Sequence, residues 1–152
     1  MSATFNDVSA LVTAVNGEPI ESAPVAVTQA MIDEFARTTN DRQWIHVDAE
    51  RARRESPYGT TIAHGFLTLS LVSTLLAGCV RFPAAQMLLN YGFERVRFIA
   101  PVPVGSEIVG RFRLTDLTDT KSGTLMEWQV EIVHCGSGRS VLIATWLLLL
   151  RA

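Results

Sequence analysis

The first candidate for chemistry is an Asp/His pair in residues 40–46, a segment without helix or strand periodicity. Asp41 and His46 stand five residues apart. Irregular backbone between apolar elements often presents catalytic side chains. Histidine titrates near neutrality, and a neighbouring aspartate can orient its ring or share a water with it, so the pair suits acid–base chemistry. The alternative is an Asx turn at Asp41 and a surface imidazole at His46. Spacing alone favours this structural interpretation, because isolated Asp/His pairs are common.

A second candidate is the sequence PYGTTIAHG over residues 57–65, which leads directly into a long apolar run. A glycine at the start of a helix lets a ligand approach the backbone, where free N–H groups can polarise a carbonyl or hold an oxyanion. Gly65 is therefore either such a donor or simply the residue that admits the helix. For His64, a capping role is favoured over direct chemistry.

The elements around these segments predict an α+β fold. Residues 64–79 carry large apolar side chains in every direction, which is typical of a helix buried on all sides. From residue 87 onward the apolar period is two, and we expect a curved antiparallel sheet wrapped around this long central helix. Turns rich in Gly and Pro divide that region into strands over 90–100, 107–118, 124–135 and 140–151. The last strand has an unbroken apolar run and must be covered on both faces.

Shorter elements precede the central helix, and apolar spacing together with capping residues defines them. They are a helix over 6–15, a strand over 25–28, a helix from the N-cap Thr28 to about Thr39, a loop or single turn over 40–48, and a short basic helix over 49–55.

Length and composition limit the class of protein. The chain has 152 residues, which fits one domain over 1–152. Apolar residues make up 48% and charged residues 18%, a surplus which suggests that another subunit covers part of the surface. The net charge of −2 gives no basis for binding nucleic acid or an anionic membrane. The first residues lack signal-peptide features and no apolar stretch is long enough to span a bilayer, so we expect a cytoplasmic protein.

Cysteines and histidines predict neither a disulfide nor a metal centre. Cys79 and Cys135 lie far apart without a CxxC spacing, and we interpret both as unreactive thiols. His46, His64 and His134 show no ligand spacing. No nucleotide-binding glycine loop precedes a helix, so no cofactor is expected.

Three motifs together resemble the MaoC-like dehydratases, and most closely the single-domain branch of nodulation-protein-N-like proteins and (R)-specific enoyl-CoA hydratases. They are Asp41-x-x-x-x-His46, TTIAHGFLTL over 60–69, and NYGFERVRF over 90–98 followed by PVPVG over 101–105. The resemblance covers about residues 25–151. It implies a hot-dog fold, with the sheet around the helix from His64, assembled as a homodimer. It also implies that Asp41 and His46 are the catalytic pair and that the N–H of Gly65 binds the thioester carbonyl.

The sequence departs from the common family signature between the two catalytic residues, where Gln43 and Trp44 replace Asn-Pro. Gln43 can still orient His46 or a water through hydrogen bonds, and Trp44 is expected to reshape the pocket mouth. Ser73 matches a polar residue that some members use near the site, although a serine in an apolar helix can equally bond back to the backbone. The predicted substrate-binding residues are Gln43, Trp44, His64 and Ser73.

The activity that the resemblance implies is reversible hydration of a trans-2-enoyl-CoA to the (R)-3-hydroxyacyl-CoA. Asp41 and His46 would activate one water, and the expected partners are the acyl-CoA thioester and a second copy of the chain. One alternative is a hot-dog thioesterase, which usually needs a carboxylate on or beside the central helix, and residues 64–79 contain none. The other is a non-catalytic subunit that binds acyl thioesters, in which loss of Asp41 or His46 would be expected.

Overall fold

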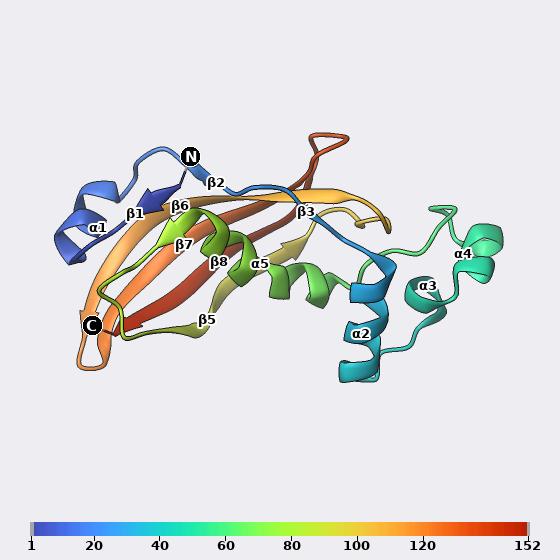
Figure 1. Ribbon diagram of the computed structural model, residues 1–152, viewed down its shortest axis with the longest axis horizontal. Coiled ribbons are helices and arrows are strands. Elements are labelled where there is room, and N and C mark those ends of the chain that lie inside the picture. The colour runs from blue at the N-terminus through green and yellow to red at the C-terminus, as the bar shows by residue number, and fades with distance from the viewer. Residues whose placement is uncertain (1, 152) are drawn as a thin grey trace.

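The computed structural model describes residues 2–151, with a curved sheet and a long helix packed against it (Figure 1). The helices are α1 (Val8–Ala14), α2 (Gln29–Thr39), α3 (Trp44–Val47), α4 (Ala49–Glu55) and α5 (Gly65–Cys79). The strands are β1 (Ala3–Thr4), β2 (Ile20–Glu21), β3 (Val25–Ala26), β4 (Val80–Arg81), β5 (Met87–Phe98), β6 (Glu107–Thr120), β7 (Gly123–His134) and β8 (Ser140–Arg151). Among the described residues, no helix is long and apolar enough to cross a membrane.

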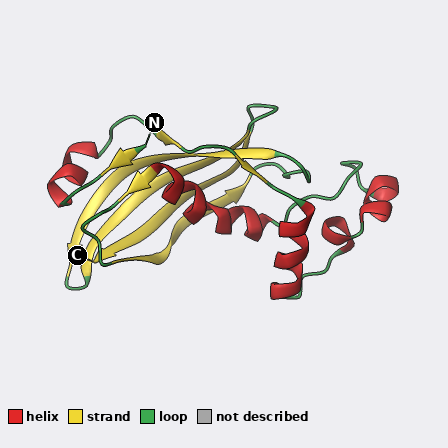
Figure 2. Cartoon of the chain, viewed as in Figure 1, coloured by secondary structure: helices red, strands yellow, loops and turns green. Residues whose placement is uncertain are grey.

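The main sheet has the strand order β2-β6-β7-β8-β5, and β3 pairs with the start of β6. These pairs are antiparallel, whereas β1 and β4 form a separate parallel pair. The long strands curve, and α5 lies against one face of the sheet (Figure 2). Helices α2, α3 and α4 gather beyond the N-terminal end of α5, away from the sheet. The predicted α+β class is confirmed.

The core lies between α5 and the inward face of the sheet. Along β6, Phe112 is fully buried while the preceding Arg111 is exposed, as a two-residue period requires. Trp128 of β7 and Trp146 of β8 stand opposite each other and are both buried. Residues 148–150 are all buried, so the end of β8 is covered on both faces, as predicted.

The central helix is buried along the face that meets the sheet and exposed along the other. Leu71, Val72 and Leu75 are at most 8% exposed. Phe66 is 67% exposed, and small or polar side chains continue its face along the helix, namely Ser70, Ser73, Thr74, Ala77 and Gly78. The expected burial on all sides therefore holds for one face only, because within one protomer the sheet contacts only that face.

β5 forms one edge of the sheet and begins three residues earlier than the sequence predicts. Met87 already pairs with Arg151 of β8, so the ladder begins before residue 90, where the predicted strand starts. Most side chains of β5 are exposed. Phe98 of β5 contacts Phe66 of α5 edge-on, with ring centroids 5.9 Å apart. The edge strand and the exposed helix face therefore meet in one surface.

Local caps fix the helix that leads to the candidate site. The side chain of Thr28 accepts a hydrogen bond from the N–H of Met31 at 3.3 Å, so Thr28 is the N-cap of α2, as predicted. At the other end, Asn40 adopts the left-handed conformation with φ of 59° and terminates the helix. The strand predicted over 25–28 is limited to β3, because the chain turns at Thr28 to begin α2.

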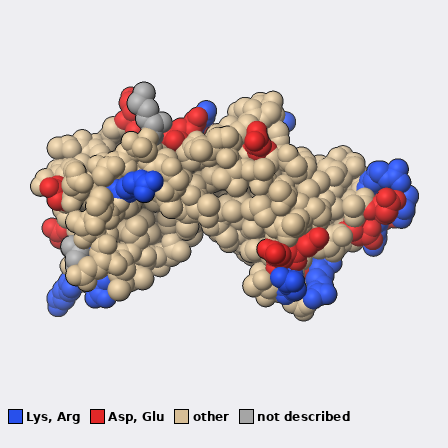
Figure 3. Space-filling view, viewed as in Figure 1, with Lys and Arg blue, Asp and Glu red and all other residues tan. Residues whose placement is uncertain are grey.

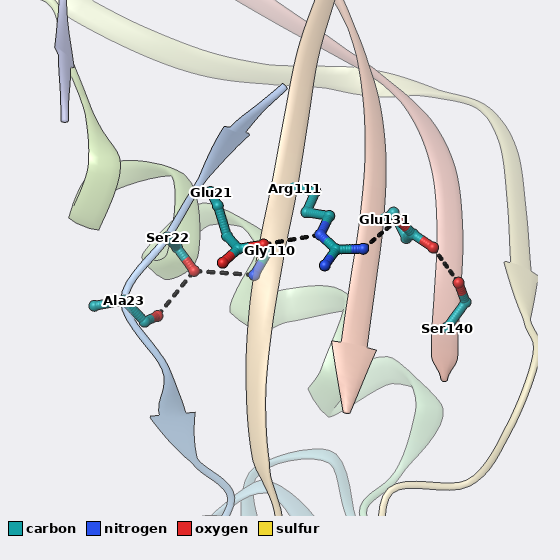
Figure 4. A network of polar contacts seen from close by, with 7 residues as sticks. All are labelled: Glu21, Ser22, Ala23, Gly110, Arg111, Glu131 and Ser140. Carbon is teal, nitrogen blue, oxygen red and sulfur yellow. Dashed lines mark hydrogen bonds and ion pairs between the residues drawn. The ribbon is translucent and has the colours of Figure 1, made fainter. Parts of the chain in front are cut away.

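The outward face of the sheet is joined by polar contacts (Figure 4). The guanidinium of Arg111 on β6 lies 2.8 Å from Glu21 of β2 and 3.4 Å from Glu131 of β7. The hydroxyl of Ser22 accepts a hydrogen bond from the N–H of Gly110 at 2.9 Å. These contacts hold the short strand β2 on the edge of β6.

Candidate active site

His46 lies on α3, a helix of four residues within the segment that the sequence predicts as a loop or single turn. Only 7% of its surface is exposed. Its Nδ1 lies 2.8 Å from the carbonyl oxygen of Ile62. A carbonyl only accepts hydrogen bonds, so Nδ1 carries the hydrogen and Nε2 keeps its lone pair. The imidazole can therefore accept a proton at Nε2.

The surroundings of His46 keep its imidazole uncharged. Burial has the largest influence and lowers the pKa of His46 from its ordinary value of 6.5. The hydrogen bond to Ile62 acts in the opposite direction, the neighbouring His64 lowers the pKa further, and the Asp41 carboxylate raises it. The net shift is downward, so at neutral pH the ring is available as a base.

Asp41 stands beside His46 in the irregular segment after α2. Its carboxylate, one ring nitrogen of His46 and one of His64 all lie within 4.8 Å of one another. This separation is less than two hydrogen bonds of about 2.8 Å each, so one water can contact both the carboxylate and the imidazole. A long Asx-type contact is also present, with 3.5 Å between Oδ1 of Asp41 and the N–H of Gln43. The turn and the pair therefore coexist, and His46 is buried rather than on the surface.

This cluster of one carboxylate and two imidazoles has the composition of a metal site but not its geometry. The rings of His46 and His64 are stacked, with centroids 3.8 Å apart and planes inclined by 24°. The lone pairs of imidazole lie in the ring plane, so two nearly parallel rings cannot direct them at one ion. The arrangement suits acid–base chemistry better than metal binding.

Gly65 is the first residue of α5 and lines the same cavity as His46. The cavity has a volume of about 250 Å³, and its other walls include Tyr58, Thr68, Phe98, Pro101 and Val141. No described side chain caps the start of α5 with a hydrogen bond. The N-terminal amides of the helix, at its positive end, are therefore placed to meet an oxygen in a cavity with a base on its wall.

The other predicted site residues are dispersed. Gln43 is the exposed N-cap of α3, and its carbonyl accepts a hydrogen bond from the N–H of His46 at 3.0 Å. Trp44 is half-buried against the guanidinium of Arg51, which lies 4.4 Å from its ring centroid. Ser73 lines a different cavity of about 430 Å³ near the C-terminal end of α5. Neither Trp44 nor Ser73 is among the described residues that line the His46 cavity.

Two residues that the sequence does not single out hold His46 in place. The Nε2 amide of Gln29 donates to the carbonyl of His46 at 2.8 Å and to Oδ1 of Asp33 at 2.8 Å. The Oε1 of Gln29 accepts from the hydroxyl of Thr61 at 2.6 Å. No local pattern could identify these contacts, because they join separate segments. Thr68 could have been found, since it is a polar residue one turn after Gly65 and belongs to the motif over 60–69.

Residues 11–134 match the family described as MaoC like domain. The chain belongs to the MaoC-like dehydratase family. Nodulation protein N from Rhizobium meliloti is 43% identical to it over 147 residues, which cover 95% of this chain and 89% of that protein. The 3-hydroxyacyl-thioester dehydratase Z from Mycobacterium tuberculosis is 43% identical over 122 residues, 80% of each chain.

Solved structures of MaoC-like proteins share the fold. A MaoC-like dehydratase from Rhodospirillum rubrum is 26% identical with a TM-score of 0.72, and the match covers 91% of this chain and 94% of that one. The (R)-hydratase from A. caviae has a TM-score of 0.72 at 22% identity, over 88% of this chain and 96% of that one. The predicted hot-dog fold is confirmed. The relatives named as dehydratases support hydro-lyase activity for this MaoC-like protein.

Proposed function

We propose that this MaoC-like protein catalyses the reversible hydration of trans-2-enoyl-CoA to (R)-3-hydroxyacyl-CoA. The observation that carries the proposal is the state of His46: a buried imidazole with a lowered pKa, its Nδ1 committed to the carbonyl of Ile62, next to the carboxylate of Asp41. A base of this kind can remove a proton from a water that the carboxylate also binds. Family membership supports the reaction class.

In the proposed reaction, Asp41 and His46 hold one water between them. Nε2 of His46 removes a proton as the water oxygen bonds to C3, and the π electrons of the double bond move toward the thioester carbonyl. The imidazolium of His46 then gives this proton to C2 from the same face, which completes the addition of one water and restores the neutral imidazole. The N–H of Gly65 stabilises the negative oxygen of the enolate-like intermediate. A donor of this type is typically worth about 3–4 kcal/mol in the transition state.

The cavity supports an acyl thioester as the substrate. Its walls are mostly apolar, with the hydroxyl groups of Tyr58 and Thr68 as exceptions. An enoyl chain can therefore be desolvated at the position where its carbonyl meets the start of α5. The thioesterase alternative has less support, because α5 holds no Asp or Glu that could activate a water or attack the carbonyl. A binding subunit without catalysis would not require the arrangement around His46.

We also propose that the chain is one domain over residues 1–152 and that it works as a homodimer formed through β5. β5 is a sheet edge with a row of free backbone groups on one side, a common place for a second strand to pair. Its surface and that of α5 expose large apolar side chains, namely Phe66, Met87, Leu88, Leu89, Tyr91, Phe93, Phe98 and Ile99. The broad middle of the view in Figure 3, over α5, is almost free of charge. A second copy would cover this surface.

The test of the activity is the loss of conjugated enoyl absorbance when purified protein meets crotonyl-CoA and a longer trans-2-enoyl-CoA. Asp41→Asn and His46→Gln are compared with His134→Gln, a control at the end of β7 whose ring contacts Ser106 and Ser137 and does not line the cavity. We expect the (R) alcohol from wild type and from the control, and loss of turnover in both site variants while each stays folded. Intact binding of CoA thioesters without turnover at any chain length would refute hydration. Light scattering of the same samples reports the oligomeric state.

A further inference from the structure

His64 is a buried polar residue that the proposed reaction does not use directly. It lies immediately before α5, is 2% exposed, and is not one of the described residues that line the His46 cavity. The predicted contact of His64 with substrate stays a prediction. In the structure, His64 contacts the two residues proposed to be catalytic.

The first contact is with the backbone of Asp41. Nε2 of His64 lies 2.9 Å from the Asp41 carbonyl oxygen, so the ring donates from Nε2. The other hydrogen bonds of Asp41 in the described chain are longer, 3.4 Å from its N–H to Thr39 and 3.5 Å from its carboxylate to Gln43. Asp41 is exposed and follows a residue in the left-handed conformation, Asn40. The bond from His64 is thus the firmest attachment of a segment with little regular structure.

The second contact is with the imidazole of His46. The two rings stack with their centroids 3.8 Å apart, and the centroid of the Phe35 ring lies 5.0 Å from that of His64. His46 is itself fixed at Nδ1 by Ile62. The stack restricts the remaining motion of the His46 ring, because the ring plane cannot tilt toward His64 without a clash.

His64 is a costly choice for packing alone. Its Nδ1 is buried and has no hydrogen-bond partner among residues 2–151. A buried polar atom without a partner destabilises the fold, and an apolar side chain of similar size would avoid the penalty. This cost points to a role in the site rather than in stability.

We propose that His64 is a positioning residue, which ties the backbone of Asp41 to the start of α5 and supports the ring of His46 from behind. It thereby fixes the spacing of the carboxylate and the imidazole, together with their relation to Gly65, which follows His64 in the chain. The inference rests on the proposed function, since positioning matters only if Asp41 and His46 act on one water. Misplacing catalytic groups by about 1 Å can cost about 100-fold in rate.

Two substitutions separate the contacts of His64. His64→Phe keeps an aromatic ring for the stack but loses the hydrogen bond, and His64→Gln keeps a donor but loses the ring. Phe35→Leu is the control, because it changes packing on the same ring without touching Asp41. We expect His64→Phe to lower kcat about 10- to 100-fold with KM for crotonyl-CoA within about two-fold, His64→Gln to recover part of the loss, and Phe35→Leu to stay near wild type.

A second readout does not depend on turnover. In NMR spectra of ligand-free protein, we expect His64→Phe to shift the carbonyl-carbon resonance of Asp41 and the imidazole resonances of His46. A variant with unchanged kcat and unchanged resonances overturns the positioning role, as does a loss of activity that only follows the loss of folded protein. If wild type fails to hydrate any enoyl-CoA, the proposed function fails, and the resonances alone decide whether His64 positions the pair. If His64→Phe does not fold, His64→Gln provides both measurements.

Discussion

The substitution Gly65→Ala places a methyl group at the point where the proposed thioester carbonyl meets the protein. Gly65 begins α5, where its negative φ is compatible with alanine. A Cβ built there would lie 3.1 Å from two ring carbons of Phe98, closer than the ordinary contact range that begins at 3.4 Å. Phe98 must therefore yield by a few tenths of an ångström.

The expected effect on stability is small. Replacing glycine by alanine in a helix contributes about 0.5–1 kcal/mol, chiefly by reducing the freedom of the unfolded chain. The contact with Phe98 offsets this gain, so we expect a net change within about 1 kcal/mol. For a domain of this size that corresponds to a change in Tm of about 2–4 °C or less.

The expected effect on activity is much larger. The new methyl group adjoins the N–H that is proposed to hold the enolate oxygen, and it occupies part of a cavity of about 250 Å³. Complete loss of such a donor costs about 100- to 1,000-fold, and the variant keeps the N–H itself, so kcat/KM should fall about 10- to 100-fold. The assay is the loss of crotonyl-CoA absorbance, together with thermal unfolding of the same preparation.

Gly78→Ala is the matched control, since it makes the same change near the other end of α5. Within the described chain nothing lies within 4 Å of a Cβ at Gly78. We expect unchanged kcat/KM, and light scattering of both variants checks that the proposed dimer is intact. Wild-type kcat/KM in Gly65→Ala would refute the placement of the thioester at the start of α5.

Three further predictions concern His46, Thr61 and the cysteines. Because the pKa of His46 is lowered, kcat/KM should fall with pH only below 6.5. Between 6.5 and the lowered pKa the unfolded chain binds the proton more readily, so the free energy of unfolding should also decrease as pH falls, and the inactive variant His46→Gln should lack this contribution to the trend in unfolding. Thr61→Val removes the donor to Gln29 and should cost about 1 kcal/mol in stability and lower kcat, whereas Thr61→Ser should do neither, as unfolding and steady-state assays will report. A thiol reagent should modify the exposed Cys135 of the native protein without loss of activity. It should spare Cys79, which is buried and whose pKa is raised by burial; fast labelling of both thiols, detected by mass spectrometry, would contradict this assignment.

The strands of this protein are predictable where a two-residue period is bounded by turns. β8 spans the residues expected from its alternation, and β7 is shifted by one residue at each end. β5 begins three residues earlier than expected, because residues 87–89 also pair with β8. The exposed face of α5 was not predictable either. An apolar sequence indicates which side chains avoid water, but not which are covered within one protomer.

The candidate site is predictable to the extent that its parts are local in sequence. Asp41 and His46 share one short segment, and Gly65 marks the start of the central helix, so the family motif is enough to name them as candidates, whereas the spacing of Asp41 and His46 alone is not. The contacts that hold them join distant segments, from Gln29 to His46 and from His64 to Asp41. The placement of Ser73 shows the reverse problem, since a matching residue type on the right helix lies beside another cavity.

The position of His46 illustrates how a site can be rigid although it lies on a weak element. A helix of four residues has no stability of its own, because helix nucleation costs more than one turn returns. The location of α3 must therefore come from its attachments, which include a hydrogen bond from the N–H of Ile62 to the carbonyl of Ile45. Three further attachments hold His46 itself, namely the Gln29 amide from α2, the Ile62 carbonyl at the Nδ1 atom, and the stacked ring of His64. These three attachments act on the backbone, on one edge of the ring and on its face. Since each restricts a different motion of the imidazole, removing any one of them should lower the rate without abolishing it, whereas removing the imidazole should abolish it.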